Sequence, residues 1–352
     1  MSRTGKPGTE PAPAYFSPRN ILIIRLRRIG DVVMTTPAVA ELRRAFPRAI
    51  ITYLIEEPFR RLVEGHPDID RVIAVPERQK AREFVALMRR IRKEAFDTVL
   101  DFHGGPRAWF ITLFSGAIRK IGYQVKYKSF IYDLKVPRDR PQGPIHSVEN
   151  HLNLVRGLGV EAGQAPSLKL SKPKEEEVRR IDRIWEENHL SGSKVVAVHI
   201  SAGNKFRDWG AENWAALVGE LGGLDGVKVL LVGGEADQDQ EKEIRARTGG
   251  RPLALVGRLN LAELGEVLAR ASLFVGPDSG PMHIAAAVGA PIVALFGPTL
   301  PAHFAPWRAK AVLLEKRLAC RPCRQRECVS QDFRCLRGIM VEDVLAAART
   351  LL

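Results

Sequence analysis

Apolar runs and amphipathic stretches alternate along the first half of the chain. The apolar run 21–26 (ILIIRL) predicts a strand, and the periodic segment 32–46, which Pro47 ends, predicts a helix. The other elements expected in this half are strands at 50–55, 72–75 and 98–102 and helices at 84–91 and 152–158. Strands that alternate with helices predict a parallel sheet covered on both faces.

The alternation begins again after a break. Residues 137–147 interrupt the pattern, and the polar, Pro-bounded segment 163–173 suits an interdomain linker. The later elements are expected as strands at 195–199, 227–232, 273–276 and 292–296 and helices at 214–221, 238–247, 261–269 and 282–288. The pattern therefore predicts an α/β protein of two units with a cleft between them, at 20–170 and 171–352, behind a loose tail at 1–19.

The composition fits this two-domain reading. At 352 residues the chain exceeds one ordinary core, and 45% hydrophobic with 27% charged residues is typical of a soluble globular protein. No stretch approaches the roughly 18 apolar residues of a membrane-spanning helix. Residues 1–19 carry Pro, Gly and charge without the apolar core of a signal peptide, so a cytoplasmic location is expected.

The formal net charge of +14 favours anionic partners such as nucleotides, phospholipid headgroups or nucleic acid. The basic residues gather at 78–93, 119–140 and 308–337, although solvated surface accounts for most of them individually. Binding to nucleic acid is not expected, because the basic runs lack interleaved aromatic residues. Neither a G-x-G-x-x-G after the first strand nor a G-x-x-x-x-G-K-[ST] is present, which argues against a nicotinamide dehydrogenase and a P-loop ATPase.

The segment 274–307 is the most informative for chemistry. A strand ends in the tight loop Pro277-Asp278-Ser279-Gly280-Pro281, with Ser279 as N-cap of the next helix and Pro281 in its first turn. The free N–H groups of that turn, with the helix dipole behind them, make a seat for a diphosphate flanked by Asp278 and His283. The alternative is an ordinary well-formed turn.

A second constellation is Arg27-Arg28-Ile29-Gly30-Asp31, directly after the first strand. Asp31 is expected at a helix start, where the dipole and the adjacent arginines stabilise its ionised form. Such a carboxylate is an available but weak general base for a hydroxyl. Taken alone, Asp31 also fits a helix cap.

Two further loops follow strands of the second unit. In the loop 199–209, Lys205 and Arg207 can neutralise phosphate beside Ser201 without Mg²⁺, or the loop is plain surface. In the segment Gly233-Gly234-Glu235-Ala236-Asp237, an acidic residue can accept hydrogen bonds from ribose hydroxyls.

All four cysteines lie within 16 residues, at Cys320, Cys323, Cys328 and Cys335. Their spacing permits a tetrahedral zinc site. The favoured interpretation is that the cysteines are free or oxidisable thiols in a basic loop. A catalytic role is not expected.

Together these strings resemble glycosyltransferase family 9, the heptosyltransferases that extend the lipopolysaccharide inner core. The strings that carry the resemblance are IGDVVMTTPAVAELRRAFP, HISAGNKFRDW, LVGGEADQ, VGPDSGPMHIAAAVGAPIVALFGPT and the terminal cysteine run with VEDVLAAARTLL. The resemblance spans residue 20 to the C-terminus. It implies a GT-B fold of two Rossmann-like domains, with nucleotide-sugar held by the C-terminal half and acceptor by the N-terminal half. The implied reaction is an inverting, metal-independent transfer of heptose from ADP-heptose, without a cofactor.

The resemblance also implies residue roles. Asp31 matches the catalytic base, and Ser279, Gly280 and His283 match the diphosphate loop. Asp278 matches the acidic residue at the donor sugar and Ser201 the donor-phosphate loop. Asp237, with Glu235 as competitor, matches the ribose ligand. The family usually has Pro at position 200 and Lys at 207, where this chain has Ile200 and Arg207, so Lys205 is a second choice for that cation.

The basic runs of the N-terminal half suit an acceptor that carries phosphates and carboxylates at an anionic membrane face. Arg107, Arg119 and Lys120 are therefore expected to bind the lipopolysaccharide core or lipid A acceptor. Peripheral contact with the cytoplasmic face of the inner membrane is expected with it. The alternatives are another nucleotide-sugar or acceptor on the same fold, or a sugar-nucleotide epimerase of GT-B shape.

Overall fold

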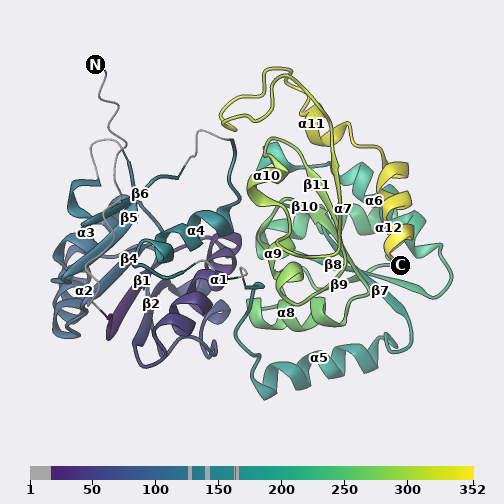
Figure 1. Ribbon diagram of the computed structural model, residues 1–352. Helices are drawn as coiled ribbons and strands as arrows, with labels where there is room; N and C mark the ends of the chain where they lie inside the picture. Colours follow the sequence, from purple (N-terminus) through teal and green to yellow (C-terminus); the bar gives the residue numbers. More distant parts are fainter. Residues whose placement is uncertain (1–16, 126–128, 139–142, 162, 164–165) are drawn as a thin grey trace.

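The computed structural model describes residues 17–125, 129–138, 143–161, 163 and 166–352. Most of the tail predicted at 1–19 lies outside these ranges. Within them the chain forms two six-stranded parallel sheets, one in each half (Figure 1).

The sheet of the N-terminal half has the order β3-β2-β1-β4-β5-β6. Its strands are β1 (Asn20–Ile24), β2 (Ile50–Glu56), β3 (Arg71–Val75), β4 (Thr98–Asp101), β5 (Arg119–Tyr123) and β6 (Leu134–Val136). Strand β1 is central and pairs in parallel with β2 and β4. It is buried from Ile21 to Ile24, as an apolar run covered on both faces requires.

Helices cover both faces of this sheet. On one face lie α1 (Ile29–Ala45) and α4 (Ser147–Arg156), together with the 3₁₀ segment η1 (Glu57–Leu62). On the other lie α2 (Ala81–Lys93) and α3 (Pro106–Phe114). A short 3₁₀ turn, η2 (Ser129–Ile131), precedes β6.

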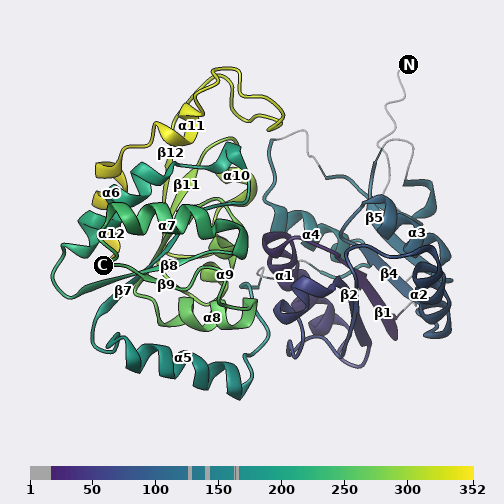
Figure 2. The same cartoon turned by 180° about the vertical axis from the view of Figure 1, so that it is seen from behind.

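The sheet of the C-terminal half has the order β12-β11-β10-β7-β8-β9. Its strands are β7 (Lys194–His199), β8 (Val227–Val232), β9 (Leu253–Ala254), β10 (Leu273–Pro277), β11 (Ile292–Phe296) and β12 (Ala311–Glu315). Helices α5 (Glu175–Glu187), α8 (Leu261–Arg270) and α9 (Gly280–Ala287) lie toward the other half, whereas α6 (Ala211–Gly222), α7 (Gln238–Arg247) and α12 (Val341–Leu351) lie outside (Figure 2). The short elements are η3 (Lys205–Arg207), η4 (Glu235–Asp237), α10 (Pro301–Phe304) and α11 (Arg334–Arg337).

The two halves share one apolar core. Buried side chains of α1 and α4 belong to the same cluster as those of α8 and α9, so the interface between the halves is packed rather than open. Charged contacts flank it, because Arg61 of η1 binds Glu177 of α5 through two hydrogen bonds of 3.1 and 2.5 Å. The carboxyl ends of several strands of both sheets supply the loops around this interface.

The observed elements agree with the expected alternation, with additions. The apolar pattern does not predict β5, β6, β9 or β12, which are short or carry charged residues, nor the helices α3, α5, α10, α11 and α12. Among the described residues, no helix has both the length and the apolar content needed to cross a bilayer.

Candidate active site between the two halves

The amino ends of α1 and α9 touch at the interface between the halves. A Cβ atom added to Gly280 would lie 2.6 Å from Ile29 Cβ, and one added to Gly30 would lie 2.7 Å from His283 Cδ2. Real carbon atoms do not approach so closely, so only glycine permits this contact at both positions. The predicted diphosphate loop and the predicted base therefore lie side by side.

Asp31 is the third residue of α1, where a carboxylate interacts favourably with the helix dipole. Its Oδ2 atom forms a salt bridge with Arg25 Nη2 at 2.5 Å and accepts a hydrogen bond from the Arg28 N–H at 3.3 Å. The Asp31 side chain is 38% exposed, so the carboxylate is anchored yet reachable from solvent. Arg25 is itself buried and donates to the Phe102 carbonyl at 2.6 Å, which ties the pair to the end of β4.

Asp31 lies on the wall of a cavity of about 650 Å³ at the carboxyl edge of the N-terminal sheet. The lining residues come from both halves and are Arg25, Arg27, Arg28, Asp31, His103, Tyr123, Arg138, Ser147, Asn150, His151, His303 and Phe304. Four arginines thus surround one carboxylate, and the guanidinium of Arg138 lies 4.3 Å from the centre of the Tyr123 ring. This cavity is suited to an anionic ligand with hydroxyl groups.

Neutral hydrogen-bonding groups lie between these arginines. Burial, with the nearby Arg25 and Arg27, lowers the pKa of His103 to about 4, so the ring is uncharged at neutral pH. The Tyr123 hydroxyl lies 2.6 Å from His151 Nδ1, and burial raises the tyrosine pKa. Such groups can bind sugar hydroxyls without adding charge.

In the C-terminal half, the loop between β10 and α9 holds a buried carboxylate. Asp278 Oδ2 accepts a hydrogen bond from Thr299 Oγ1 at 2.6 Å and lies 3.3 Å from Arg207 Nη1. Burial raises the pKa of Asp278, and the Arg207 charge opposes that rise. Arg207 and Asp278 therefore partly neutralise each other's charge. The Nε of Arg207 donates a hydrogen bond to Gln325 Oε1 at 3.3 Å.

Ser279 occupies the N-cap position of α9 as predicted, but its side chain does not cap the helix. Its Oγ lies 3.2 Å from Nδ1 of His199, at the end of β7. Burial lowers the pKa of His199 to about 4 and that of His283 to about 3, so both rings are neutral at pH 7. The first-turn N–H groups of α9 thus keep no side-chain partner from their own cap.

The remaining residues predicted to bind donor are more exposed. Ser201 accepts the Gly203 N–H at 3.0 Å, and the Lys205 amine lies 5.5 Å from the Phe206 ring. Asp237 caps its own turn, because its Oδ2 accepts the Gly234 N–H at 2.7 Å. Glu235 in the same turn is exposed.

The three basic residues expected to bind acceptor do not line the cavity. Arg107 is held by internal contacts, with Nη1 3.1 Å from Glu56 Oε1 and Nη2 2.6 Å from Gln79 Oε1. Arg119 and Lys120 begin β5, whereas Tyr123, which lines the cavity, ends it. Since a strand rises about 3.3 Å per residue, Lys120 and Arg119 lie about 10 and about 13 Å from Tyr123 along the strand. Arg119 and Lys120 lie away from the cavity because they begin β5, and Arg107 because its guanidinium is held by Glu56 and Gln79; their binding of acceptor stays a prediction.

The four cysteines are free thiols and line one small cavity of about 30 Å³ with Phe206 and Phe333. In the part of the chain that the structure describes, no group of three or more His, Cys, Asp or Glu side chains could hold a metal ion. The arrangement therefore lends no support to the zinc alternative.

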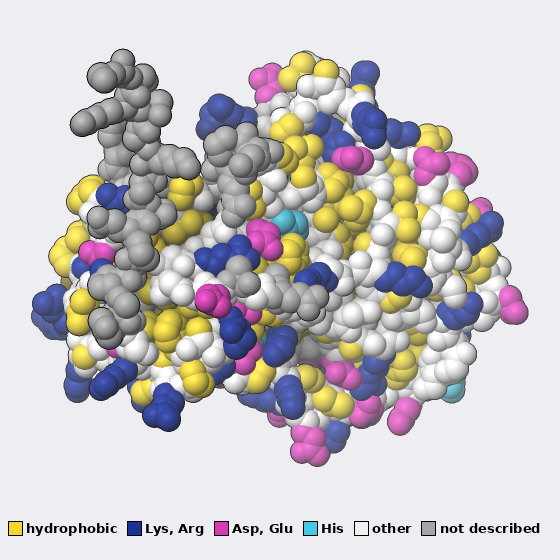
Figure 3. Space-filling model, viewed as in Figure 1, with side chains coloured by type: hydrophobic (Ala, Val, Ile, Leu, Met, Phe, Trp, Pro, Cys, Tyr) yellow, Lys and Arg dark blue, Asp and Glu magenta, His cyan; other side chains and the backbone are white. Residues whose placement is uncertain are grey.

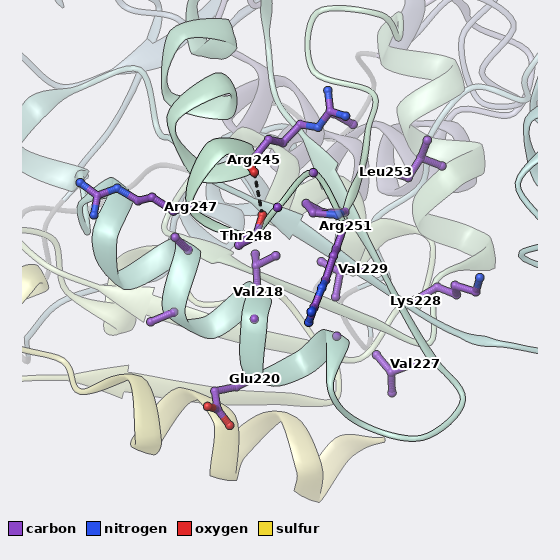
Figure 4. Close-up of a pocket in the computed structure, with 18 of the residues that line it drawn as sticks. Val218, Glu220, Val227, Lys228, Val229, Arg245, Arg247, Thr248, Arg251 and Leu253 are labelled. Atoms are coloured by element: carbon purple, nitrogen blue, oxygen red, sulfur yellow. Dashed lines mark hydrogen bonds between the residues drawn. The ribbon is translucent and has the colours of Figure 1, made fainter.

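A larger cavity of about 1090 Å³ lies away from these residues, on the outer side of the C-terminal half (Figure 4). It is lined by α6, the start of β8 and the segment after α7. These are the amino ends of the strands, the edge opposite the loops that carry Asp278 and His199. Its size alone does not make it the reaction site.

Several cavity residues were not singled out from the sequence. His103, Tyr123 and Arg138 follow or end strands β4, β5 and β6. All three are polar residues near the carboxyl end of a parallel strand, where site residues gather. Tyr123 and Arg138 could be predicted in this way only if β5 and β6 were first predicted as strands.

Comparison with known proteins agrees with this architecture. Residues 84–333 match the family model described as glycosyltransferase family 9 (heptosyltransferase). Lipopolysaccharide heptosyltransferase 3 of Escherichia coli K12 is 24% identical over 342 residues, covering 93% of this chain and 96% of that protein.

Two solved structures are similar over nearly the whole chain. The glycosyltransferase family 9 protein from Veillonella parvula has a TM-score of 0.82 and 25% identity, covering 95% of this chain and 97% of that one. The E. coli ADP-heptose lipopolysaccharide heptosyltransferase II has a TM-score of 0.78 and 22% identity, with 94% and 98% covered. The two-sheet architecture is therefore the GT-B fold predicted from the sequence.

Proposed function

Because the chain belongs to glycosyltransferase family 9, we propose that it transfers heptose from ADP-heptose to an inner-core lipopolysaccharide acceptor, with Asp31 as general base. The protein is a transferase of the heptosyltransferase family. The donor, the acceptor and the residue roles are the proposal. The observation that supports them is the contact between the amino ends of α1 and α9, which brings Asp31 of α1 close to the first turn of α9, the proposed diphosphate seat.

The proposed reaction is a single displacement at the anomeric carbon. An acceptor hydroxyl attacks C1 from the face opposite the diphosphate, the new C–O bond forms, and the configuration inverts. The C1–O bond to phosphate breaks, and ADP leaves with the electron pair. Asp31 takes the hydroxyl proton. Its Oδ2 is engaged by Arg25 and Arg28, which orients the carboxylate and leaves Oδ1 to reach the acceptor.

The leaving diphosphate gains negative charge in the transition state. We assign its stabilisation to the first-turn N–H groups of α9 after Ser279 and Gly280, with Ser201, Lys205 and Arg207 nearby. These fixed donors and cations supply the charge that a metal would otherwise supply. His283 lines the seat from α9, Asp278 contacts the donor sugar, and Asp237 or Glu235 binds the ribose.

The arginine-lined cavity is the proposed acceptor site. Arg27, Arg28 and Arg138 suit the phosphates and carboxylates of a lipopolysaccharide core, and they replace Arg107, Arg119 and Lys120 in that role. We also propose peripheral contact with the cytoplasmic face of the inner membrane, where such an acceptor lies. The net charge of +14 supports it.

The direct test is Asp31→Asn, which removes the base and keeps the size of the side chain. Turnover is expected to fall by about 10² to 10⁴, while donor affinity measured by calorimetry stays near the wild-type value. The matched control is Asp239→Asn, since that carboxylate is exposed on α7. A kcat within tenfold of wild type would exclude Asp31 as the base.

The donor and the reaction class are tested separately. Calorimetry with ADP-heptose, UDP-sugars and GDP-sugars is expected to show tight binding of the ADP-sugar alone. Incubation of ADP-heptose without acceptor is expected to leave the sugar unchanged. Conversion to an epimer there would favour the epimerase alternative.

A further inference from the structure

Helix α3 of the N-terminal half carries apolar side chains on its solvent side. A surface helix normally buries one apolar stripe and exposes polar residues. In α3, Ala108, Ile111 and Thr112 face the core, but Phe110 and Phe114 are 46% and 51% exposed. The sequence of α3, PRAWFITLF, contains one charged residue.

The exposed apolar surface continues beyond the helix. Ile118 in the turn after α3 is 70% exposed, and Phe130 in η2 is 71% exposed. Trp109 connects α3 with η2, because its ring lies 5.1 Å from that of Phe110 and 5.7 Å from that of Phe130, both in edge-to-face geometry. We call Phe110, Phe114, Ile118 and Phe130 the α3 patch. Exposed apolar groups gathered in this way mark an interaction surface.

Basic side chains border the α3 patch. Arg92 of α2 lies over the turn between Phe114 and Ile118, since its Nη1 would be 3.5 Å from a Cβ added to Gly116. Arg89 and Lys93 of the same helix are exposed. At the left of Figure 3, where α2 and α3 lie, hydrophobic side chains are flanked by Lys and Arg. An apolar centre with a cationic border matches the interface of an anionic bilayer, with hydrocarbon below charged headgroups.

The α3 patch and the arginine-lined cavity lie in the same half of the protein. Helix α3 begins three residues after His103, which lines the cavity, whereas Ile118 directly precedes β5, whose far end at Tyr123 lines it. A bilayer in contact with the α3 patch would therefore hold the N-terminal half at the membrane surface without burying the cavity in it.

We propose that the α3 patch inserts into the headgroup region of an anionic membrane and so holds the enzyme at the surface that carries its acceptor. This inference rests on the proposed function, because a lipid-linked acceptor is the reason for the enzyme to bind a membrane. It makes a separate physical claim: binding requires the four apolar side chains as well as the basic ones.

The test is flotation of the full chain with vesicles of phosphatidylethanolamine and phosphatidylglycerol, at low and high salt. Phe110→Ser/Phe114→Ser/Phe130→Ser is expected to lower the partition coefficient at least about tenfold, because each phenylalanine gives up apolar burial. The control Val329→Ser/Met340→Ser removes two exposed apolar side chains from the C-terminal half and should bind like wild type. Circular dichroism establishes that both variants fold.

A second readout separates this inference from the proposed function. With a water-soluble, deacylated acceptor, the triple variant should keep wild-type kcat/KM, whereas with acceptor embedded in vesicles its rate should fall with its binding. Unchanged vesicle binding by the triple variant, or no binding by wild type, would overturn the inference. A dimeric wild type that becomes monomeric in the variant, with equal vesicle binding, would identify the patch as a self-association surface instead. Lack of transfer to either acceptor, with patch-dependent binding retained, would count against the proposed function alone.

Discussion

Gly280→Ala is the sharpest perturbation of the contact between α1 and α9. The new Cβ would lie 2.6 Å from Ile29 Cβ and 3.3 Å from the Gly30 nitrogen, and neither atom can rotate away. Carbon atoms are at their best separation near 3.5–4.0 Å, so the two helix ends must move apart by about 1 Å. A misplacement of that size costs about 10²-fold in rate. Overpacking is expected to lower the free energy of unfolding by about 1–3 kcal/mol.

The assay is kcat/KM for transfer, together with ADP affinity and a urea unfolding curve. ADP affinity is expected to change only a few-fold, because the N–H groups of α9 remain. Gly30→Ala should be milder, since its Cβ meets the ring of His283 and not backbone. The control is Gly219→Ala in α6, which has open space around it and should gain about 0.5–1 kcal/mol in stability. A Gly280→Ala enzyme with kcat/KM within threefold of wild type would refute the role of this contact.

Two further predictions concern buried charge. The pKa values of His199 and His283 are lowered to about 4 and about 3, so the unfolded chain binds more protons than the folded one below about pH 6.5. The free energy of unfolding should therefore fall as pH drops from about 6.5 toward 4, by up to about 3 kcal/mol per ring. Equal urea midpoints at pH 7 and pH 5 would contradict this. The variant His199→Gln should reduce the dependence of the free energy of unfolding on pH. Arg207→Ala leaves the buried Asp278 carboxylate without its cation and should weaken ADP-sugar binding about tenfold or more. Arg207→Ala in an Asp278→Asn background should reduce the affinity for the ADP-sugar by a smaller factor. Equal losses of affinity in the two backgrounds would show that Arg207 and Asp278 are not coupled.

The periodic elements of this chain were predictable because their signal is local. Strand β11 and helix α7 begin and end where the apolar pattern places them. The position of Asp31 at the start of α1 also follows from the sequence, because Gly30 and an apolar-periodic segment frame it. Local rules of periodicity and capping are enough for such features.

The composition of the arginine-lined cavity, the proposed acceptor site, was not predictable in the same way. Arg119 and Lys120 are conspicuous in the sequence, yet their place at the start of β5 takes them to the wrong edge of the sheet. Arg138 is less conspicuous but lies over Tyr123 at the cavity wall. Which basic residues meet depends on strand order and register, and these are set by long-range pairing.

The seam where α1 meets α9 carries one further consequence. Each half presents a complete binding surface of its own: arginines around Asp31 on one side, and the α9 turn on the other. On the proposed assignment, the reacting centre exists only while these two surfaces abut. Any hinge motion that released product would then separate Asp31 from the donor before the sugar-nucleotide met water, and the architecture itself would suppress hydrolysis of the donor.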